Sequence, residues 1–325
     1  MTVLVTGGAG YIGSHTVYAL LDRGDGVVVL DNLSTGIKAQ VGRDAAFVQG
    51  DIADAALVKK TVVGHKVDSV IHFAGSIVVP DSVADPLAYY DNNVVRTRAL
   101  IQAAVESGVR NFIFSSTATV YAEDAPQPLA EHAPKGPISP YARSKLMTEW
   151  MLEDVSRAHP LRHITLRYFN VAGADPQGRT GQSSPNATHL VKRAAMVALG
   201  RLPQLDIFGT DYPTPDGTGV RDYIHVTDLA AAHLLALDAL RGGAASTVYN
   251  CGYGRGLSVR QVVEGVEKVT GKTLPVRLGP RRPGDPPTLV SDPSRIKAAL
   301  GWTPAHDGLE EIIASAIAWE RRFNG

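Results

Sequence analysis

A glycine-rich segment near the amino terminus constrains the fold of this chain more than any other feature. Gly7, Gly10 and Gly13 recur at intervals of three, between an apolar run at residues 3–5 and a stretch with helical spacing. Glycine lets the backbone turn tightly and approach a pyrophosphate, and the free amides of the following helix face the same anion. The segment therefore predicts a strand–turn–helix unit with a dinucleotide site at its turn.

Two aspartates extend this prediction. Asp31 ends the second apolar run, about 20 residues after the turn, where a carboxylate can bind the ribose hydroxyls of the nucleotide. A carboxylate there repels a 2′-phosphate, so NAD is favoured over NADP, although Asp31 could instead only stabilise a turn before Asn32. Asp51 follows the third run, where it can reach the adenine or, equally well, cap the next helix.

The first half of the chain alternates short apolar runs with helical patterns. Such alternation is typical of a parallel sheet covered by helices on both faces, so we predict an α/β fold with a Rossmann-type doubly wound parallel sheet. Strands are expected at 3–5, 27–30, 47–48, 70–73, 112–114 and 164–166, and helices at about 13–24, at 93–106 and from 141 onward. In the third helix, Leu146, Met147, Trp150 and Met151 form an apolar stripe that we interpret as core packing.

The composition of the chain changes after about residue 170, and the regular alternation of strands and helices is lost. Proline and glycine become denser, as at 212–217 and 280–287, although a helix is still expected at 229–240 and a strand at 248–250. We predict an NAD-binding domain at 1–169, to which a segment near 222–247 returns, and a smaller C-terminal α/β substrate lobe at 170–325. Because no flexible linker separates them, the active site is expected in the cleft between the two.

Composition narrows the functional classes. The 325 residues carry 32 Lys and Arg and 32 Asp and Glu, and this zero net charge argues against a general nucleic-acid or anionic-membrane binder. A single cysteine, Cys251, leaves no intramolecular disulfide and fits a reducing compartment. Without a signal peptide or an apolar run of about 20 residues, a cytoplasmic location is expected. The histidines are scattered, and His159 and His163 lack carboxylates at ligand spacing, so no metal site is predicted.

Tyr141 and Lys145 form the candidate catalytic pair. They lie four residues apart and therefore project from one helical face. A nearby ammonium and a positively charged nicotinamide would favour the phenolate and lower the tyrosine pKa from its usual value of about 10, which suits a base. The pattern alone is common by chance, but here it follows a strand that ends in hydroxyls at 115–121, one of which could bind the reacting hydroxyl.

The motifs together resemble a known family. The segments 7–13, 31–33, 72–75, 89–93, 115–121 and 141–145 resemble the extended short-chain dehydrogenases/reductases. The segments 167–170, 217–225 and 281–285 narrow the resemblance to the UDP-sugar 4-epimerases that interconvert UDP-galactose and UDP-glucose. The resemblance covers essentially the whole chain. It implies a homodimer that inverts carbon 4 of a UDP-hexose through a 4-keto intermediate, with tightly bound NAD regenerated in each turnover.

The resemblance also implies residue roles. Tyr141 would remove the proton of the sugar 4-hydroxyl, and Arg221 and Arg282 would clamp the diphosphate, for which their guanidinium groups suit. For the arginines the alternative is a surface ion pair, such as Arg282 with Asp285. The catalytic residues would be Tyr141, Lys145 and Thr117. The cofactor residues would be Gly7, Gly10, Tyr11, Ile12, Gly13, Asp31, Asn32, Asp51, Ile52, Phe73, Ala74, Gly75, Asn92, Tyr141, Lys145 and Phe169. The substrate residues would be Thr117, Tyr141, Asn170, His189, Leu190, Asp206, Phe208, Arg221, Arg282 and Asp285.

Some positions depart from the family pattern. Thr117 stands where a serine is frequent and keeps the hydroxyl, whereas Ile77 replaces a lysine that some members place near the cofactor. His189 stands where others carry asparagine, which leaves its role as a ligand open. Leu289 aligns with a gate where tyrosine is associated with rejecting N-acetylated sugars and a small residue with accepting them. An N-acetylhexosamine or pentose UDP-sugar is therefore an alternative substrate.

Other reactions on the same scaffold are also considered. Dehydratases need an acid pair directly after the catalytic threonine, and decarboxylases typically show a glutamate in the same stretch. Ala118 and Thr119 follow Thr117 instead, which counts against both. A non-epimerising oxidoreductase and an NAD-binding sensor remain as alternatives.

Overall fold

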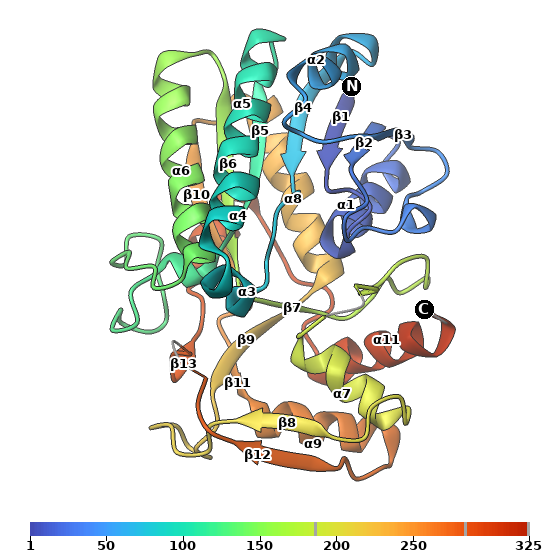
Figure 1. The fold of residues 1–325 in the computed structure, drawn as a ribbon, viewed down its shortest axis with the longest axis vertical. Helices are drawn as coiled ribbons and strands as arrows, with labels where there is room; N and C mark the ends of the chain where they lie inside the picture. The colour runs from blue at the N-terminus through green and yellow to red at the C-terminus, as the bar shows by residue number, and fades with distance from the viewer. Residues whose placement is uncertain (185–186, 283–284, 324–325) are drawn as a thin grey trace.

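A seven-stranded parallel sheet forms the centre of the larger part of the molecule (Figure 1). The computed structural model describes residues 1–184, 187–282 and 285–323. The strand order is β3-β2-β1-β4-β5-β6-β10, which reverses direction between β1 and β4. The strands are β1 Thr2–Thr6, β2 Gly26–Asp31, β3 Ala46–Gln49, β4 Val67–His72, β5 Asn111–Thr117, β6 Arg162–Tyr168 and β10 Thr247–Cys251. The apolar runs expected to be strands in the first half all belong to this sheet.

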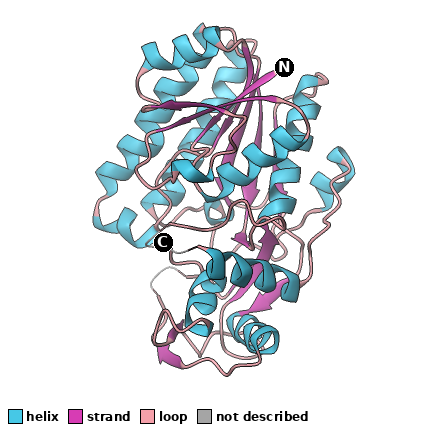
Figure 2. Ribbon diagram, turned by 90° about the vertical axis from the view of Figure 1, so that its right-hand side faces the viewer, coloured by secondary structure: helices cyan, strands magenta, loops and turns pink. Residues whose placement is uncertain are grey.

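Helices cover both faces of the large sheet, as Figure 2 shows. On one face, α1 (Tyr11–Asp22) and α8 (Val226–Arg241) pack together through Leu20 and Leu237. The other face carries α2 (Ala55–Gly64), α5 (Arg96–Glu106) and α6 (Pro140–Ala158), whose apolar side chains share a second cluster with β4 and β5. Strands buried on both faces need continuous apolar runs, which explains their sequence pattern. The predicted Rossmann-type doubly wound α/β fold is confirmed.

The helical regions differ from the prediction in two places. The helix expected from residue 93 begins only at Arg96, because α3 (Val79–Ala84), α4 (Pro86–Tyr90) and a π-helical turn at Asp91–Val95 precede it. The prediction that the whole apolar stripe of α6 packs in the core is wrong. Leu146 is buried, but Met147 and Trp150 are 37% and 55% exposed. The buried face of α6 instead carries polar side chains, which displaces the apolar stripe toward the surface.

The smaller lobe has two sheets and, in the described part of the chain, three helices that pack in its own core. That core joins apolar residues of both sheets to those of these helices. One sheet contains β7 (Asn170–Ala172), β9 (Val220–His225), β11 (Gly256–Ser258) and β13 (Thr288–Leu289), and the other pairs β8 (Leu205–Phe208) with β12 (Val276–Gly279). The helices are α7 Leu190–Ala198, α9 Val259–Thr270 and α11 Leu309–Arg322, whereas α10 (Ser294–Leu300) packs through Ile296 on the large sheet.

The chain passes between the two parts more than once. After β9 it forms α8 and β10, which lie on and in the large sheet, before it returns to the smaller lobe with β11 (Figure 1). We therefore propose residues 1–169 with this returning segment as the nucleotide-binding domain, and the rest of 170–325 as the second lobe. Within the described residues, no helix is both long and apolar enough to cross a membrane.

Candidate active site

The glycine turn lies where the order of the large sheet reverses, which is the usual ligand position in such sheets. Gly7 has φ +71°, and a Cβ there would lie 2.5 Å from the backbone nitrogen of Ala74. A Cβ on Gly13 would lie 2.2 Å from the carbonyl oxygen of Gly7. Gly10 caps α1 without a side chain, so the first amides of the helix stay available for an anion. Only glycine fits this close approach, as the sequence predicted.

Asp31 is held in place at the end of β2. Its carboxylate accepts hydrogen bonds from the backbone amides of Ala9 at 2.9 Å and of Leu33 at 2.8 Å, and the residue is 8% exposed. The bond from Leu33 is the turn that the alternative interpretation expected. A carboxylate has about four acceptor positions, so these two bonds leave capacity for ribose hydroxyls.

Asp51 does not cap a helix, so that alternative is wrong. The cap of α2 is Asp54, whose carboxylate accepts from the backbone amide of Leu57 at 2.9 Å. Asp51 instead accepts from Asn32 at 3.2 Å and pairs with Arg96 at 2.6 Å. Burial favours the neutral acid, but the bonded donors and Arg96 outweigh it and hold the pKa of Asp51 below its usual value. Arg96 was not foreseen, because nothing in the local sequence links it to Asp51.

The candidate catalytic residues meet at the end of β5. Ser139 caps α6 by accepting a bond from the backbone amide of Ala142 at 3.2 Å, which starts the helix directly before Tyr141. Lys145 donates to the carbonyl oxygen of Ser115 at 3.1 Å, and the hydroxyl of Thr117 bonds to Tyr141. Tyr141, Lys145 and Thr117 are 8%, 4% and 7% exposed, so water has little access to them.

Burial dominates the electrostatics of this pair. It raises the pKa of Tyr141 to about 12, against a smaller opposite effect of the Thr117 hydrogen bond. It lowers the pKa of Lys145 to about 8, against the nearby charge of Glu149. Without the cofactor, desolvating a phenolate therefore costs more than the protein partners of Tyr141 return. The predicted fall in the tyrosine pKa concerns the site with a positively charged nicotinamide beside it and stays a prediction.

Asn93 joins the loop after β4 to the catalytic helix. Its amide nitrogen donates to the carbonyl oxygen of Ser76 at 2.9 Å and to the hydroxyl of Ser144 at 3.0 Å, and its oxygen accepts from the amide of Ser76 at 2.8 Å. A Cβ on Gly75 would lie 3.1 Å from the Asn93 side chain and 3.7 Å from the Lys145 nitrogen. Asn92 donates to the Ser76 hydroxyl at 2.8 Å. Asn93 lay within the motif at 89–93, but only the structure reveals its bridging role.

The remaining predicted cofactor residues surround this turn and loop. Tyr11 is the first residue of α1, and its hydroxyl donates to the carbonyl oxygen of Gly173 at 2.6 Å. Ile12 follows it, and Ile52 is buried beneath the Asp51 loop. Phe73 packs on the ring of His233 with centroids 4.8 Å apart. Phe169 is buried in a cluster with Ala118, next to the candidate catalytic threonine.

Arg221 and Arg282 have different surroundings in the smaller lobe. Arg221 lies on β9, and its guanidinium is 3.4 Å from the carboxylate of Asp285. The alternative ion pair of Asp285 therefore forms with Arg221 and not with Arg282. The Arg282 guanidinium lies 4.0 Å from the centre of the Phe208 ring, at the end of β8. Pro283 and Gly284 of the same motif lie outside the described residues.

Two further positions named in the sequence analysis lie on strands that pair with β9, whereas the side chain of a third forms an ion pair elsewhere in the lobe. Asn170 begins β7 and is paired in register with Tyr223 of β9. Leu289 is paired with Arg221 and packs against the buried cluster that holds Phe169. The Asp206 carboxylate, by contrast, pairs with Arg277 at 2.8 Å, which leaves it engaged on an exposed flank.

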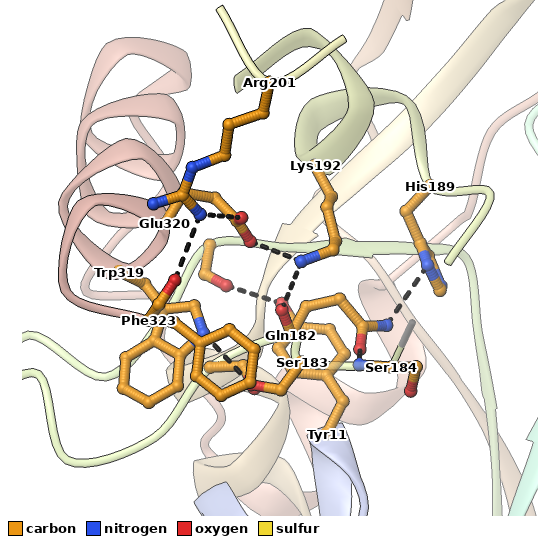
Figure 3. Close-up of polar contacts among 12 residues, drawn as sticks. Tyr11, Gln182, Ser183, Ser184, His189, Lys192, Arg201, Trp319, Glu320 and Phe323 are labelled. Atoms are coloured by element: carbon orange, nitrogen blue, oxygen red, sulfur yellow. Dashed lines mark hydrogen bonds and ion pairs between the residues drawn. The ribbon is translucent and has the colours of Figure 1, made fainter. Parts of the chain in front are cut away.

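His189 lies beside Tyr11 at a small cavity of about 20 Å³. Figure 3 shows the polar contacts of the residues around it. Gln182 accepts from the backbone amide of Ser184 at 3.0 Å, so its amide nitrogen donates to Nδ1 of His189 at 3.2 Å. Burial and the Lys192 charge lower the pKa of His189 to about 4. The neutral imidazole must therefore carry its proton on Nε2. Leu190, the next residue, begins α7.

The far wall of this cavity is charged. The Lys192 ammonium donates to the carbonyl oxygen of Gln182 at 2.8 Å and pairs with Glu320 of α11 (Figure 3). Arg201 approaches the second oxygen of Glu320 at 3.4 Å. This buried pair fixes the backbone that carries Gln182, and through it the orientation of His189.

Comparison with known proteins identifies the family. Residues 3–252 match the family model described as NAD dependent epimerase/dehydratase family. The chain belongs to this family. It is 56% identical over 319 residues to a UDP-glucose 4-epimerase of Azospirillum brasilense, an alignment that covers 98% of this chain and 92% of the relative.

Solved structures of the family share the fold over the whole chain. The UDP-glucose 4-epimerase from Brucella ovis in complex with NAD is 45% identical, with a TM-score of 0.95 and coverage of 98% of this chain and 97% of that one. The enzyme from Stenotrophomonas maltophila with bound NAD and formylated UDP-arabinopyranose is 40% identical, with a TM-score of 0.95 and coverage of 99% and 98%. The resemblance stated from the sequence is thereby confirmed.

Proposed function

We propose that this chain is an NAD-dependent isomerase that inverts carbon 4 of a UDP-hexose and so interconverts UDP-galactose and UDP-glucose. The observation that carries the proposal is the meeting of Tyr141, Lys145 and Thr117 at the end of β5, beside a glycine turn built for a dinucleotide. Full-length relatives and NAD-bound neighbours with this activity support it. An NAD-binding sensor would not need a buried proton-transfer pair.

The chain's own residues fit NAD. Neither Gly7 nor Gly13 has room for a Cβ atom, so the backbone of this turn can approach a pyrophosphate closely. The helix α1 would direct its first backbone amides at the same anion. Asp31 would bind the adenosine ribose, and the Asn32–Asp51 pair would face the adenine. Lys145, close to Gly75, would reach the nicotinamide ribose. When bound, NAD would supply a hydride acceptor, and in its reduced form a hydride donor, for sugar carbon 4.

Proton transfer falls to Tyr141. Its phenol oxygen would take the proton of the sugar 4-hydroxyl and later return it, while the Thr117 hydroxyl holds the same sugar oxygen. A tyrosine with a pKa of about 12 is a poor base near neutral pH, so a nearby cation must favour its phenolate. Lys145, one helical turn away, is the protein group positioned to do so.

The smaller lobe would bind the UDP part. Arg221 and Arg282 supply two guanidinium groups for the diphosphate, and Phe208, against which Arg282 lies, offers an aromatic ring for the base. Asn170 and Asp285 would add polar contacts, and the Nε2–H group of His189 would act as a neutral donor. Asp206 would contribute only through the strand that carries Phe208, because Arg277 engages its carboxylate.

A related UDP-sugar is the second candidate substrate. Leu289 packs against the cluster around Phe169 and Ala118, next to the catalytic threonine. A leucine at this place is smaller than a tyrosine, so it leaves more room beside the sugar. We therefore include N-acetylhexosamine and pentose UDP-sugars in the proposal as slower alternatives.

We also propose a homodimer formed through α5 and α6. The predicted core residues that the structure leaves exposed, Met147 and Trp150, both lie on α6. A groove of about 630 Å³ runs between the helices, lined by Ile101, Val105 and other residues. A second copy would cover these apolar groups by the same face, as a two-fold contact requires. We further propose a cytoplasmic location, which the single free cysteine, Cys251, supports.

The experiment is to incubate the purified protein with UDP-galactose without added NAD and to measure UDP-glucose. Conversion is expected, because the cofactor stays bound and is regenerated. Protein shown to contain NAD that nevertheless converts no UDP-galactose would refute the proposal. UDP-N-acetylgalactosamine and UDP-arabinopyranose, offered to the same preparation, test the breadth that Leu289 would allow.

A further inference from the structure

A buried ion pair lies directly behind the candidate catalytic residues, and only its arginine belongs to a segment of the family pattern. Glu149 of α6 and Arg167 of β6 are 5% and 4% exposed. The Arg167 guanidinium donates to both oxygens of Glu149, with Nε at 3.0 Å and 3.2 Å. Its third nitrogen donates to the hydroxyl of Tyr121 at 3.0 Å and to the carbonyl oxygen of Glu131 at 3.2 Å. The pair is thus fully bonded, with two charges withdrawn from water.

The pair connects the catalytic helix with the strand opposite it. Glu149 lies one helical turn after Lys145, on the same buried face of α6. It accepts a 2.5 Å hydrogen bond from the hydroxyl of Ser116. Ser116 stands between Ser115, whose carbonyl oxygen accepts from Lys145, and Thr117, which bonds to Tyr141. One carboxylate therefore holds the strand segment that carries both partners of the catalytic pair.

Stability alone does not explain such a pair. Withdrawing two charges from water costs roughly what their attraction returns, and apolar replacements of similar size are frequently neutral or better. The position beside Lys145 offers a function instead. Of the titratable groups around that ammonium, Tyr141 on α6, His72 on β4 and Tyr168 on β6 are kept neutral by burial, which leaves Glu149 as the negative charge. Burial lowers the pKa of Lys145 to about 8, and Glu149 opposes this shift.

We propose that Glu149, held by Arg167, is a positioning residue for the reaction: it keeps Lys145 charged and fixes Ser115 and Thr117 opposite Tyr141 and Lys145. The inference rests on the proposed function, because it concerns the pair that would move the proton. Arg167 limits the influence of Glu149, since its own charge offsets part of that of the carboxylate. The two residues would therefore act on Lys145 in opposite directions.

The test compares the pH profiles of kcat for Glu149→Gln and Arg167→Gln with wild type. Glutamine keeps an acceptor for Ser116 but removes the charge, so the alkaline limb of Glu149→Gln should move to lower pH by about one unit, with kcat at pH 8 reduced roughly 10-fold. Arg167→Gln leaves Glu149 unneutralised, so its alkaline limb should move to higher pH. Glu149→Asp should restore part of the shift. KM for UDP-galactose and the NAD content per chain should stay within about 3-fold of wild type, because neither residue touches the substrate.

Controls separate this role from a structural one. Asp68→Asn removes a partly buried carboxylate of another ion pair, with Arg241 at 3.0 Å, at the opposite end of the large sheet, and should leave the pH profile in place. If Glu149→Gln does not fold, the double variant with Arg167→Gln leaves no buried charge unpaired and takes its place, with a smaller shift in the same direction as Glu149→Gln. An alkaline limb that stays at its wild-type pH in every folded variant would overturn the inference. Wild-type protein that contains NAD and is inactive would instead contradict the proposed function.

Discussion

The two parts of the active site are built in different ways. At the carboxyl edge of the large sheet, the ligand groups are backbone amides and side chains fixed by short local segments, such as the glycine turn and the start of α6. In the smaller lobe, they are long side chains from distant segments, such as Arg221 and Arg282, held by contacts across the fold. A local turn tolerates almost no change in shape, whereas a long side chain can be lost without loss of the fold. Substitutions in the first part should therefore abolish chemistry or cofactor binding, and those in the second should weaken substrate binding.

The largest effect is expected for Tyr141→Phe. Removing the phenol oxygen removes the proton acceptor, so kcat should fall about 10²- to 10⁴-fold while NAD stays bound. Steady-state kinetics and the NAD content of the purified protein measure the two quantities. Tyr249→Phe, at an equally buried tyrosine on β10, is the matched control and should keep wild-type kcat. Near-normal turnover of Tyr141→Phe would remove this residue from its proposed role.

Gly13→Ala should remove cofactor binding. The added methyl group would lie 2.2 Å from the Gly7 carbonyl oxygen, so the turn must open and the backbone cannot approach the pyrophosphate. We expect less than about a tenth of the wild-type NAD content, measured on the purified protein. Gly64→Ala on α2, where no atom lies within 4 Å of the new Cβ, should keep full NAD content and gain up to about 1 kcal/mol of stability. Full NAD content in Gly13→Ala would show that the glycine turn tolerates a change in shape and that cofactor binding does not depend on it.

Arg221→Gln should separate binding from chemistry. Charge-assisted hydrogen bonds contribute about 1.5–3 kcal/mol, so KM for UDP-galactose should rise roughly 10- to 100-fold, with kcat changed much less. Arg277→Gln, the same substitution at an exposed ion pair in the same lobe, should leave both constants near wild type. A loss of kcat at unchanged KM would place Arg221 in the catalytic step instead.

The same contrast decides what the sequence could predict. The glycine turn and the strands of the large sheet follow from local spacing, so they were predicted correctly. The cap of α2 was open, because two aspartates precede that helix and only packing selects Asp54. The outward position of Trp150 was missed, because a helix whose buried face is polar contradicts the usual pattern. The pairing of Arg96 with Asp51 and that of Glu149 with Arg167 could not be read from the sequence, because the partners lie far apart in the chain. Arg167 lies in the motif at 167–170, but the motif does not name its partner.

The smallest effect on activity at neutral pH is expected from the buried histidines, which instead lower the stability in acid, mainly in the large sheet. Burial, with a smaller effect of the Lys145 charge, lowers the pKa of His72 to about 3, and burial lowers that of His233 to about 4. Both histidines are fully buried and neutral. A histidine with a lowered folded-state pKa binds its proton more readily when unfolded, so its stabilising effect is present above pH of about 6.5 and is lost as the pH falls below it. Between pH 7 and pH 5, each should cost about 2 kcal/mol.

Urea unfolding at both pH values measures this loss. The wild-type free energy of unfolding should be lower at pH 5, and His72→Gln should show a smaller difference between the two pH values, because it removes one titrating group from the core. The comparison uses the difference between pH values within each protein, so a general destabilisation by the substitution cancels. His65→Gln, at an exposed histidine that ends α2, is the matched control and should keep the wild-type difference. The prediction fails if the difference in unfolding free energy between the two pH values is equal in all three proteins. His72 would then have the same pKa in the folded and unfolded states, contrary to its burial.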